Sequence, residues 1–232
     1  LQKAQENEDI TDPVDLVEQD YYQAETWVDK INNWTGDDYE ELNDWIPTVY
    51  PGNTAQDRLN AYTADMARKM RLSYPTQVIA RLIETDDNFK LLTKNKATIT
   101  LLKSAAKQGF RLGQTPVETY LESHVGVRRG MSDMDYQAAK QELKTLQRIY
   151  QVTPSNEAMP VLMSLNLDSA YGIMAYSKTE FIDLYNKMYV ELYTWSAAED
   201  EAEMIYHKAQ QVSSVTYNLF AIAKQVDNTV SF

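Results

Sequence analysis

The sequence predicts an all-α fold, an array of short antiparallel helices that ends in one long helix of about 30 residues. Small or apolar residues recur at alternating steps of three and four between residues 202 and 226, which places them on one side of a helix. Only seven Gly and seven Pro interrupt 232 residues. No segment alternates apolar and polar residues as a half-buried strand does. Several prolines stand where they suit the first turn of a helix: Pro13, Pro75, Pro116 and Pro154.

The first half of the chain contains helices whose starts are marked by capping residues. Asp12, followed by Pro13, begins a helix that we expect to run to about residue 33, where the sequence TGDD ends it. Asn53 or Thr54 caps a later helix. Further helices are predicted at 39–46, 54–73, 75–84 and 95–108, with a turn at 89–92 and a stop at Gly109.

The second half carries three predicted capping boxes, in which a hydroxyl and a carboxylate satisfy each other's backbone N–H groups. These boxes pair Thr115 with Glu118, Ser177 with Glu180, and Ser196 with Glu199. Helices are predicted at 115–121, 132–150, 154–165, 168–173 and 177–188, and the long helix follows Ser196. The buried side of the helix at 132–150 is expected to contain Met134, Ala138, Leu143, Leu146 and Ile149.

The long helix carries the candidate interaction surface, which we call the seam. The seam is narrow and rich in Ala and Thr, so a partner helix could approach it closely. That partner is expected either elsewhere in this chain or in another chain. The residues of the seam are Ala202, Ile205, Ala209, Val212, Thr216, Leu219, Ala223 and Val226.

Composition predicts a single all-α fragment over residues 1–232, with residues 1–12 frayed. Charge is distributed unevenly along it, because residues 1–57 hold 15 acids and two bases while residues 58–150 hold nine acids and 16 bases. The bases of the middle segment are dispersed over several helices, so no nucleic-acid partner is expected. A subdivision is drawn from this distribution, into an acidic helical head (13–57), a helical middle (58–150), and helical hairpins plus the long helix (151–232).

Catalytic, cofactor and metal sites are not expected, nor is a small-molecule substrate. The glycines follow no strand and therefore make no phosphate loop, and the chain contains no cysteine. His124 lies in no recognisable nucleophile motif. Glu199, Glu203 and His207 share one helix face, but carboxylate-bridged metal sites use Glu-x-x-His. The spacing here is Glu-x-x-x-His and no second motif occurs, so a solvated acidic face is favoured over a metal site. The sequence therefore predicts a protein that is not an enzyme.

Three segments carry a family resemblance. They are AYTADMARKMRLSYPTQVIARLI (61–83), LKTLQRIYQVTPSNEAMPVLMSLNLDSAYGIMAYSKTEFI (143–182) and EAEMIYHKAQQVSSVTYNLFAIAK (201–224). In this order they resemble the α-helical region of the A subunit of Tc toxins, the insecticidal ABC toxin complexes of bacteria. Asn166 stands where the family has Gly, and Tyr171-Gly172 replaces a polar pair.

The resemblance implies a non-catalytic segment of the helical shell of a secreted virulence factor. In that family the A subunit is a homopentamer around a translocation channel, it binds B and C subunits, and it meets the target-cell membrane through other regions. The shell is a scaffold, so no catalytic residue is carried over. The alternative is a free-standing helical protein–protein interaction module that binds a helix or peptide along the Ala202–Val226 seam.

Overall fold

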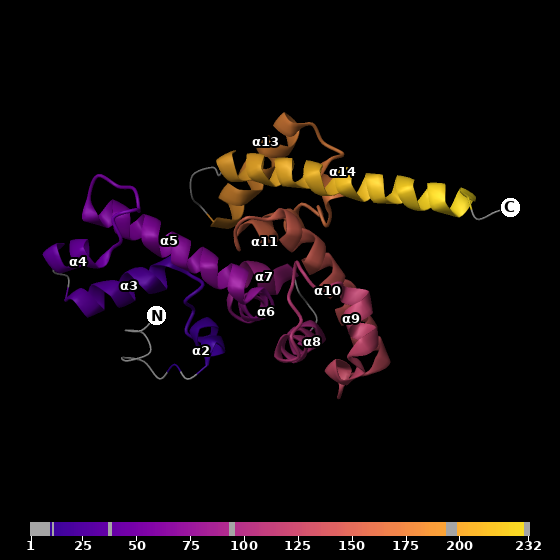
Figure 1. Ribbon diagram of the computed structural model, residues 1–232, viewed down its shortest axis with the longest axis horizontal. Coiled ribbons are helices and arrows are strands. Elements are labelled where there is room, and N and C mark those ends of the chain that lie inside the picture. Colours follow the sequence, from indigo (N-terminus) through magenta and orange to yellow (C-terminus); the bar gives the residue numbers. More distant parts are fainter. Residues whose placement is uncertain (1–9, 11, 37–38, 93–95, 194–198, 230–232) are drawn as a thin grey trace. The chain divides into compact units, whose positions relative to one another are not determined.

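The structure is a computed structural model that describes residues 10, 12–36, 39–92, 96–193 and 199–229, and over these ranges its regular elements are all helical (Figure 1). The chain forms two compact units, residues 1–82 and 83–232. The division between them falls within helix α6 (Pro75–Thr85) and inside the segment 58–150 that the sequence treats as one middle region. Most of the expected frayed start lies outside the described residues.

The first unit is built around the packing of α3 on α5. Buried apolar residues from both helices, from α4 and from the residue directly after α4 meet in one core, and indole and phenol rings border it. The core residues are Ile31, Leu42, Ile46, Ala55 and Leu59. The helices of this unit are α2 (Pro13–Glu18), α3 (Ala24–Thr35), α4 (Tyr39–Trp45), α5 (Ala55–Ser73) and the first part of α6.

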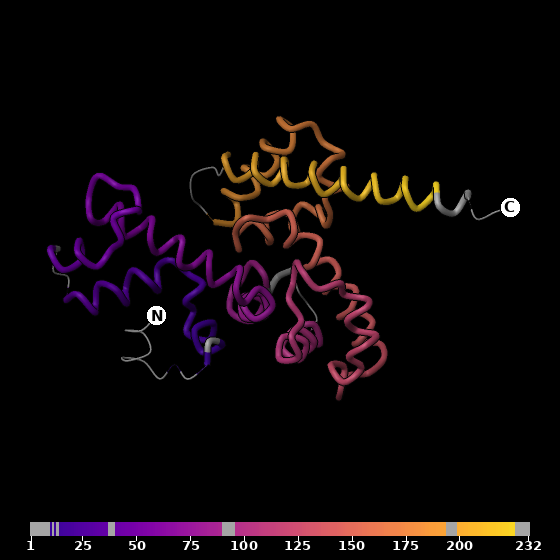
Figure 2. Tube along the Cα trace, viewed as in Figure 1, coloured from indigo at the N-terminus to yellow at the C-terminus, as the bar shows by residue number. Residues whose placement is uncertain are grey.

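The predicted helix from residue 13 to residue 33 is wrong, because the chain turns between α2 and α3 (Figure 2). Asp20 adopts a left-handed backbone conformation with φ of 61°, which Asp tolerates better than most residues. Its carboxylate accepts hydrogen bonds from the Tyr22 hydroxyl at 3.0 Å and from Arg81 Nε at 3.1 Å. The turn buries Tyr21 and Trp27, and the Trp27 indole N–H donates to the Tyr21 carbonyl at 2.6 Å.

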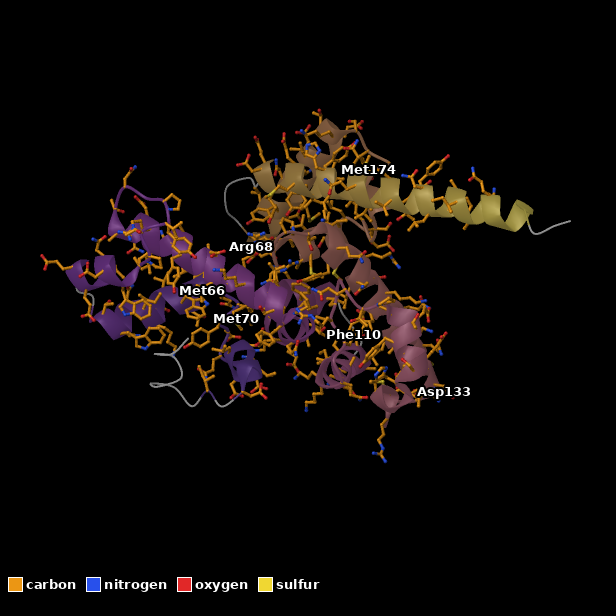
Figure 3. All side chains as sticks on the ribbon, in the orientation of Figure 1. Met66, Arg68, Met70, Phe110, Asp133 and Met174 are labelled. Atoms are coloured by element: carbon orange, nitrogen blue, oxygen red, sulfur yellow. The ribbon has the colours of Figure 1, made fainter. Side chains whose placement is uncertain are left out.

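The second unit contains the remaining helices, and α10 is its centre. Helix α10 packs on α8, while α14 packs on α12 and α13. Phe110, which follows α8, is buried against the Tyr120 ring (Figure 3). The elements are α7 (Asp87–Leu92), α8 (Lys96–Lys107), α9 (Val117–Ser123), the 3₁₀ turn η1 (Val125–Arg128), α10 (Asp133–Val152), α11 (Ala158–Ser164), α12 (Ala170–Ile173), α13 (Lys178–Tyr193) and α14 (Glu199–Thr229).

Several helix starts agree with their predicted caps. Asp12 accepts the Val14 N–H at 2.9 Å, Thr54 accepts the Asp57 N–H at 3.0 Å, and Ser177 forms the predicted box with Glu180. The predicted box of Ser196 with Glu199 lies outside the described residues, which omit 194–198.

The capping box predicted for Thr115 and Glu118 is wrong. The Thr115 N–H donates to the Arg111 carbonyl at 2.8 Å, and the Thr115 hydroxyl accepts the Arg111 N–H at 3.0 Å. Both groups therefore close a turn instead of capping α9, and Glu118 pairs with Lys140 and Lys144 on α10.

Two of the four prolines expected at the first helical position lie elsewhere. Pro116 is the residue before α9, and Pro154 belongs to the turn before α11, where the Ser155 hydroxyl accepts the Ala158 N–H at 3.1 Å. Pro13 and Pro75 begin their helices as predicted.

The buried side of α10 begins at different residues from those predicted. Met134 and Ala138 are exposed, whereas Tyr136 and Ala139 are buried. The centre of the Tyr136 ring lies 5.4 Å from the Arg128 guanidinium on η1, so the first turn of α10 contacts η1 through this side chain.

Candidate functional site

The first half of α14 is an integral part of the second unit. Ala202, Ile205 and Ala209, the first three residues of the seam, are fully buried. Helices α12 and α13 cover this half, and α10 also contacts α14. Because each seam residue here is small or branched, the neighbouring helices pack closely against it. This half of the seam already has its partner within the chain.

Polar contacts fix the same half of the helix. The buried Tyr185 hydroxyl on α13 donates to Glu201 Oε2 at 2.6 Å, and the Tyr206 hydroxyl donates to the Tyr176 carbonyl at 3.1 Å. Burial, together with the negative charge of Glu201, raises the pKa of the Tyr185 hydroxyl above its ordinary value of 10.0. The neutral phenol is therefore held as a donor between α13 and α14.

The second half of α14 extends past the helices that cover the first half (Figure 1). Val212 is half-buried, and Thr216, Leu219 and Ala223 are exposed, with 63% of Leu219 accessible to solvent. The side chain of Val226 lies outside the described residues. The structure thus divides the seam into a buried half and an exposed half. We call residues 212–225 the exposed segment.

The exposed segment carries large apolar side chains that the predicted seam did not include. Val215 and Ile222 lie one residue before Thr216 and Ala223 along the chain, and they widen the seam into a broad apolar stripe. Phe220 lies beside the stripe, and the Lys224 ammonium sits 5.4 Å from the centre of its ring, whereas the exposed Tyr217 lies on the opposite side of the helix. The side chains of the segment stand clear of the other ribbons in Figure 3. The sequence itself indicates the wider stripe once the residue directly before each seam residue is taken into account.

Hydrogen bonding makes the exposed segment less polar than its composition indicates. The Thr216 hydroxyl donates to the Val212 carbonyl at 2.8 Å, and the Ser214 hydroxyl donates to the Gln210 carbonyl at 2.8 Å. Each hydroxyl is therefore satisfied by the preceding turn of the same helix.

Charge is nearly absent from the exposed segment. Lys224 is its one charged residue, whereas Asp, Glu, Lys and Arg make up 24% of the whole chain. The start of the same helix is acidic, since Glu199, Asp200, Glu201 and Glu203 fall within its first five residues. An exposed, apolar and almost uncharged helical segment is the usual mark of a surface that another molecule covers.

The residues considered as metal ligands or catalytic groups either contact other side chains or lie exposed on the surface. Glu203 forms an ion pair with Lys178 at 3.1 Å, and His207 is exposed. The His124 ring stacks on Tyr120 with centroids 4.1 Å apart. Within the described ranges, no group of three or more His, Cys, Asp or Glu side chains is placed to hold a metal ion.

Basic side chains of the middle segment (58–150) form ion pairs with nearby acidic side chains. Lys103 Nζ lies 2.6 Å from Glu84, and Lys140 and Lys144 together hold the pKa of Glu118 below its ordinary value. These pairs reduce the positive charge that the middle segment presents to solvent.

None of the helices in the described ranges is long and apolar enough to cross a membrane.

Comparisons with known proteins leave the exposed segment as the main guide to function. No family model matches the chain, and no curated protein or solved structure matches it significantly.

Proposed function

We propose that the chain is a non-catalytic helical scaffold, a shell segment of a Tc-like toxin A subunit, which joins a larger assembly through the exposed segment of α14. The second unit positions this segment, because the buried first half of α14 is anchored against α12 and α13. The exposed half is then presented as a continuation of a fixed helix. Its partners are other helices of the same assembly.

One observation carries this proposal: the same heptad seam continues from a buried half into an exposed half. Ile205 is fully buried while Leu219, two heptads later, is 63% exposed. Apolar surface of this kind gains about 25 cal/mol for each Å² that a partner removes from water. The resemblance of segments 61–83, 143–182 and 201–224 to the Tc shell supports a large helical assembly as the setting.

A free-standing interaction module is the second candidate. The exposed segment favours it too, since a peptide or helix could bind there without any further chain. The burial of Ala202, Ile205 and Ala209 restricts such binding to residues from Val212 onward.

The reading frame on both sides of these 232 residues tests the proposal. We expect a continuous frame that encodes a much larger protein, with neighbouring genes for partners that enclose a toxic enzyme. A frame that starts near Leu1 and stops after Phe232 would overturn the shell proposal and leave the free-standing module.

A further inference from the structure

We propose that acid changes which neighbour holds α10 more firmly: protonation of Glu142 strengthens the contact of α10 with α8, and protonation of Glu118 weakens the contact of α10 with α9. Both carboxyl groups lie in the second unit and contact α10 or belong to it. Neither lies on the exposed segment of α14, so this pH response is separate from the proposed docking role.

Glu142 places a carboxyl group in the contact between α8 and α10. The side chain is half-buried on α10, and its carboxylate accepts a hydrogen bond from the hydroxyl of Thr98, which is fully buried on α8. The residues one turn away on the same side of α10 are Ala139 and Leu146, and both are fully buried. The carboxyl group therefore meets an apolar helix contact in which Thr98 supplies the hydrogen-bond donor.

The charged groups of the helices packed around α10 have other partners or are exposed. Bases of α8 and α10 form these ion pairs: Lys103 with Glu84, Lys140 and Lys144 with Glu118, and Arg148 with Asp168. On α14, Glu201 and Glu203 have the partners described above. Helix α11 contains no titratable side chain, and further titratable side chains of α8, α9, α12 and α14 are exposed: Lys96, Lys107, Glu122, Tyr171, His207 and Lys208. Within the described ranges, burial and the Thr98 hydroxyl therefore govern the Glu142 carboxyl group.

Burial makes the contact of α8 with α10 more stable in acid. It raises the pKa of the Glu142 carboxyl above its ordinary value of 4.5, and the hydrogen bond from Thr98 opposes this rise only in part. The folded chain therefore holds this proton more tightly than the unfolded chain does. The resulting stabilisation is complete below about pH 4.5 and is lost as pH rises through the higher pKa of the folded state.

Glu118 gives the contact of α9 with α10 the opposite pH dependence. Its carboxylate pairs with Lys140 and Lys144, which lie on successive turns of α10, and Glu122 and Tyr136 also face Lys140. Hydrogen bonds from the two ammonium groups hold the pKa of Glu118 below its ordinary value of 4.5. The stabilisation from these pairs is present above about pH 4.5 and is lost as pH falls through the lower pKa of the folded state.

The two responses occur on opposite sides of α10 and in a fixed order. Glu142 stands two residues from both lysines, which is about 200° around the helix axis. Because Glu142 takes up its proton at a higher pH than Glu118, acidification first strengthens the contact with α8 and then weakens the contact with α9.

Amide hydrogen exchange of glutamine variants tests both responses at about pH 7, because glutamine has the shape of a protonated carboxyl group and requires no acid. We expect Glu142→Gln to slow exchange in α8 severalfold relative to the parent chain and to leave α9 unchanged. Glu118→Gln should speed exchange in α9 severalfold and leave α8 unchanged. Glu191→Gln is the matched control, since Glu191 is an exposed acid on α13 of the same unit, and it should change neither helix.

The same exchange measurement at about pH 4.5 supplies the second test, after correction for the intrinsic exchange rates. The difference in α8 between Glu142→Gln and the parent chain should become smaller than at about pH 7, because the parent chain then binds the proton itself. Thr98→Val removes the donor to the ionised carboxylate, so it should speed exchange in α8 more at about pH 7 than at about pH 4.5. Combined with Glu142→Gln, it should lose this dependence on pH.

Three results would contradict this pH response. Equal exchange in α8 of the parent chain and Glu142→Gln at both pH values would show that the carboxyl group does not act on the contact. An equal effect of Glu191→Gln would show a general response to the net charge of −12. A change in α8 and α9 in the same direction in both variants would show one cooperative response instead of two opposed ones. The reading frame tests the shell proposal independently, so either can fail without the other.

Discussion

Tyr185 shows how one side chain joins two helices. Its ring is fully buried on α13, and its hydroxyl reaches Glu201 in the first turn of α14. Ring contacts continue along α13 from Phe181 through Tyr185 to Tyr189, so the hydroxyl is carried by an aromatic row rather than by an isolated residue. The donor and the carboxylate hold the start of α14 in register with α13.

We expect Tyr185→Phe to lower the free energy of unfolding by about 1–3 kcal/mol, because it leaves Glu201 without its donor. The effect also has a pH dependence. The folded chain holds the phenol proton more tightly than the unfolded chain does, so this stabilisation is complete below about pH 10 and is lost as pH rises further. Urea unfolding between pH 8 and 11 should show a smaller alkaline loss in the variant than in the parent chain. Tyr171→Phe, at an exposed position, should keep the parental pH profile.

At the scale of the element, α14 is one continuous helix whose two halves have different surroundings. The first half contributes to the core of the second unit, and the second half faces solvent. Its backbone hydrogen bonds are the same throughout, so the difference lies in what packs on each face.

The two halves should differ sharply in their response to truncation. We expect Ile205→Ala to cost about 2–5 kcal/mol of unfolding free energy, because it opens a cavity among α12, α13 and α14. Leu219→Ala should change it by less than about 0.5 kcal/mol in the monomer, since most of Leu219 is already exposed. Urea unfolding at low protein concentration checks both. Equal losses would mean that the second half is also covered within one chain.

The features that the sequence predicts correctly depend on neighbours close along the chain. The caps at Asp12, Thr54 and Ser177 involve residues two or three positions away, and the long helix follows from its own periodicity. The turn at Asp20 could not be predicted in this way, because Arg81 supports it from a distant part of the sequence.

The seam illustrates the same limit at the candidate site. Its spacing predicts one helical face over its whole length, and periodicity carries no information on where the covering helices end. Burial of Ala209 and exposure of Leu219 depend on the reach of α12 and α13, which is a property of the folded unit.

At the scale of the whole molecule, each of the two units has a core of its own. Leu59 is fully buried in the first unit, and Leu143 is fully buried in the second. Separate cores allow separate unfolding, even though α6 contributes residues to both units.

Calorimetry of the full chain should therefore resolve two transitions. Leu59→Ala should lower the midpoint of one of them and Leu143→Ala that of the other, each by the several degrees that a cavity of one leucine produces. If both substitutions shifted a single transition by the same amount, the two units would unfold as one cooperative body.

The contact between Asp20 and Arg81 also has a consequence for synthesis on the ribosome. The two residues are 61 positions apart, and Arg81 lies in the last helix to contribute to the first unit. Chains generally fold as they are made, from the amino terminus onward. The turn between α2 and α3 therefore lacks the guanidinium of Arg81 until α6 has emerged from the ribosome. Because α6 also contains the first residues of the second unit, the first unit is completed as synthesis of the second begins.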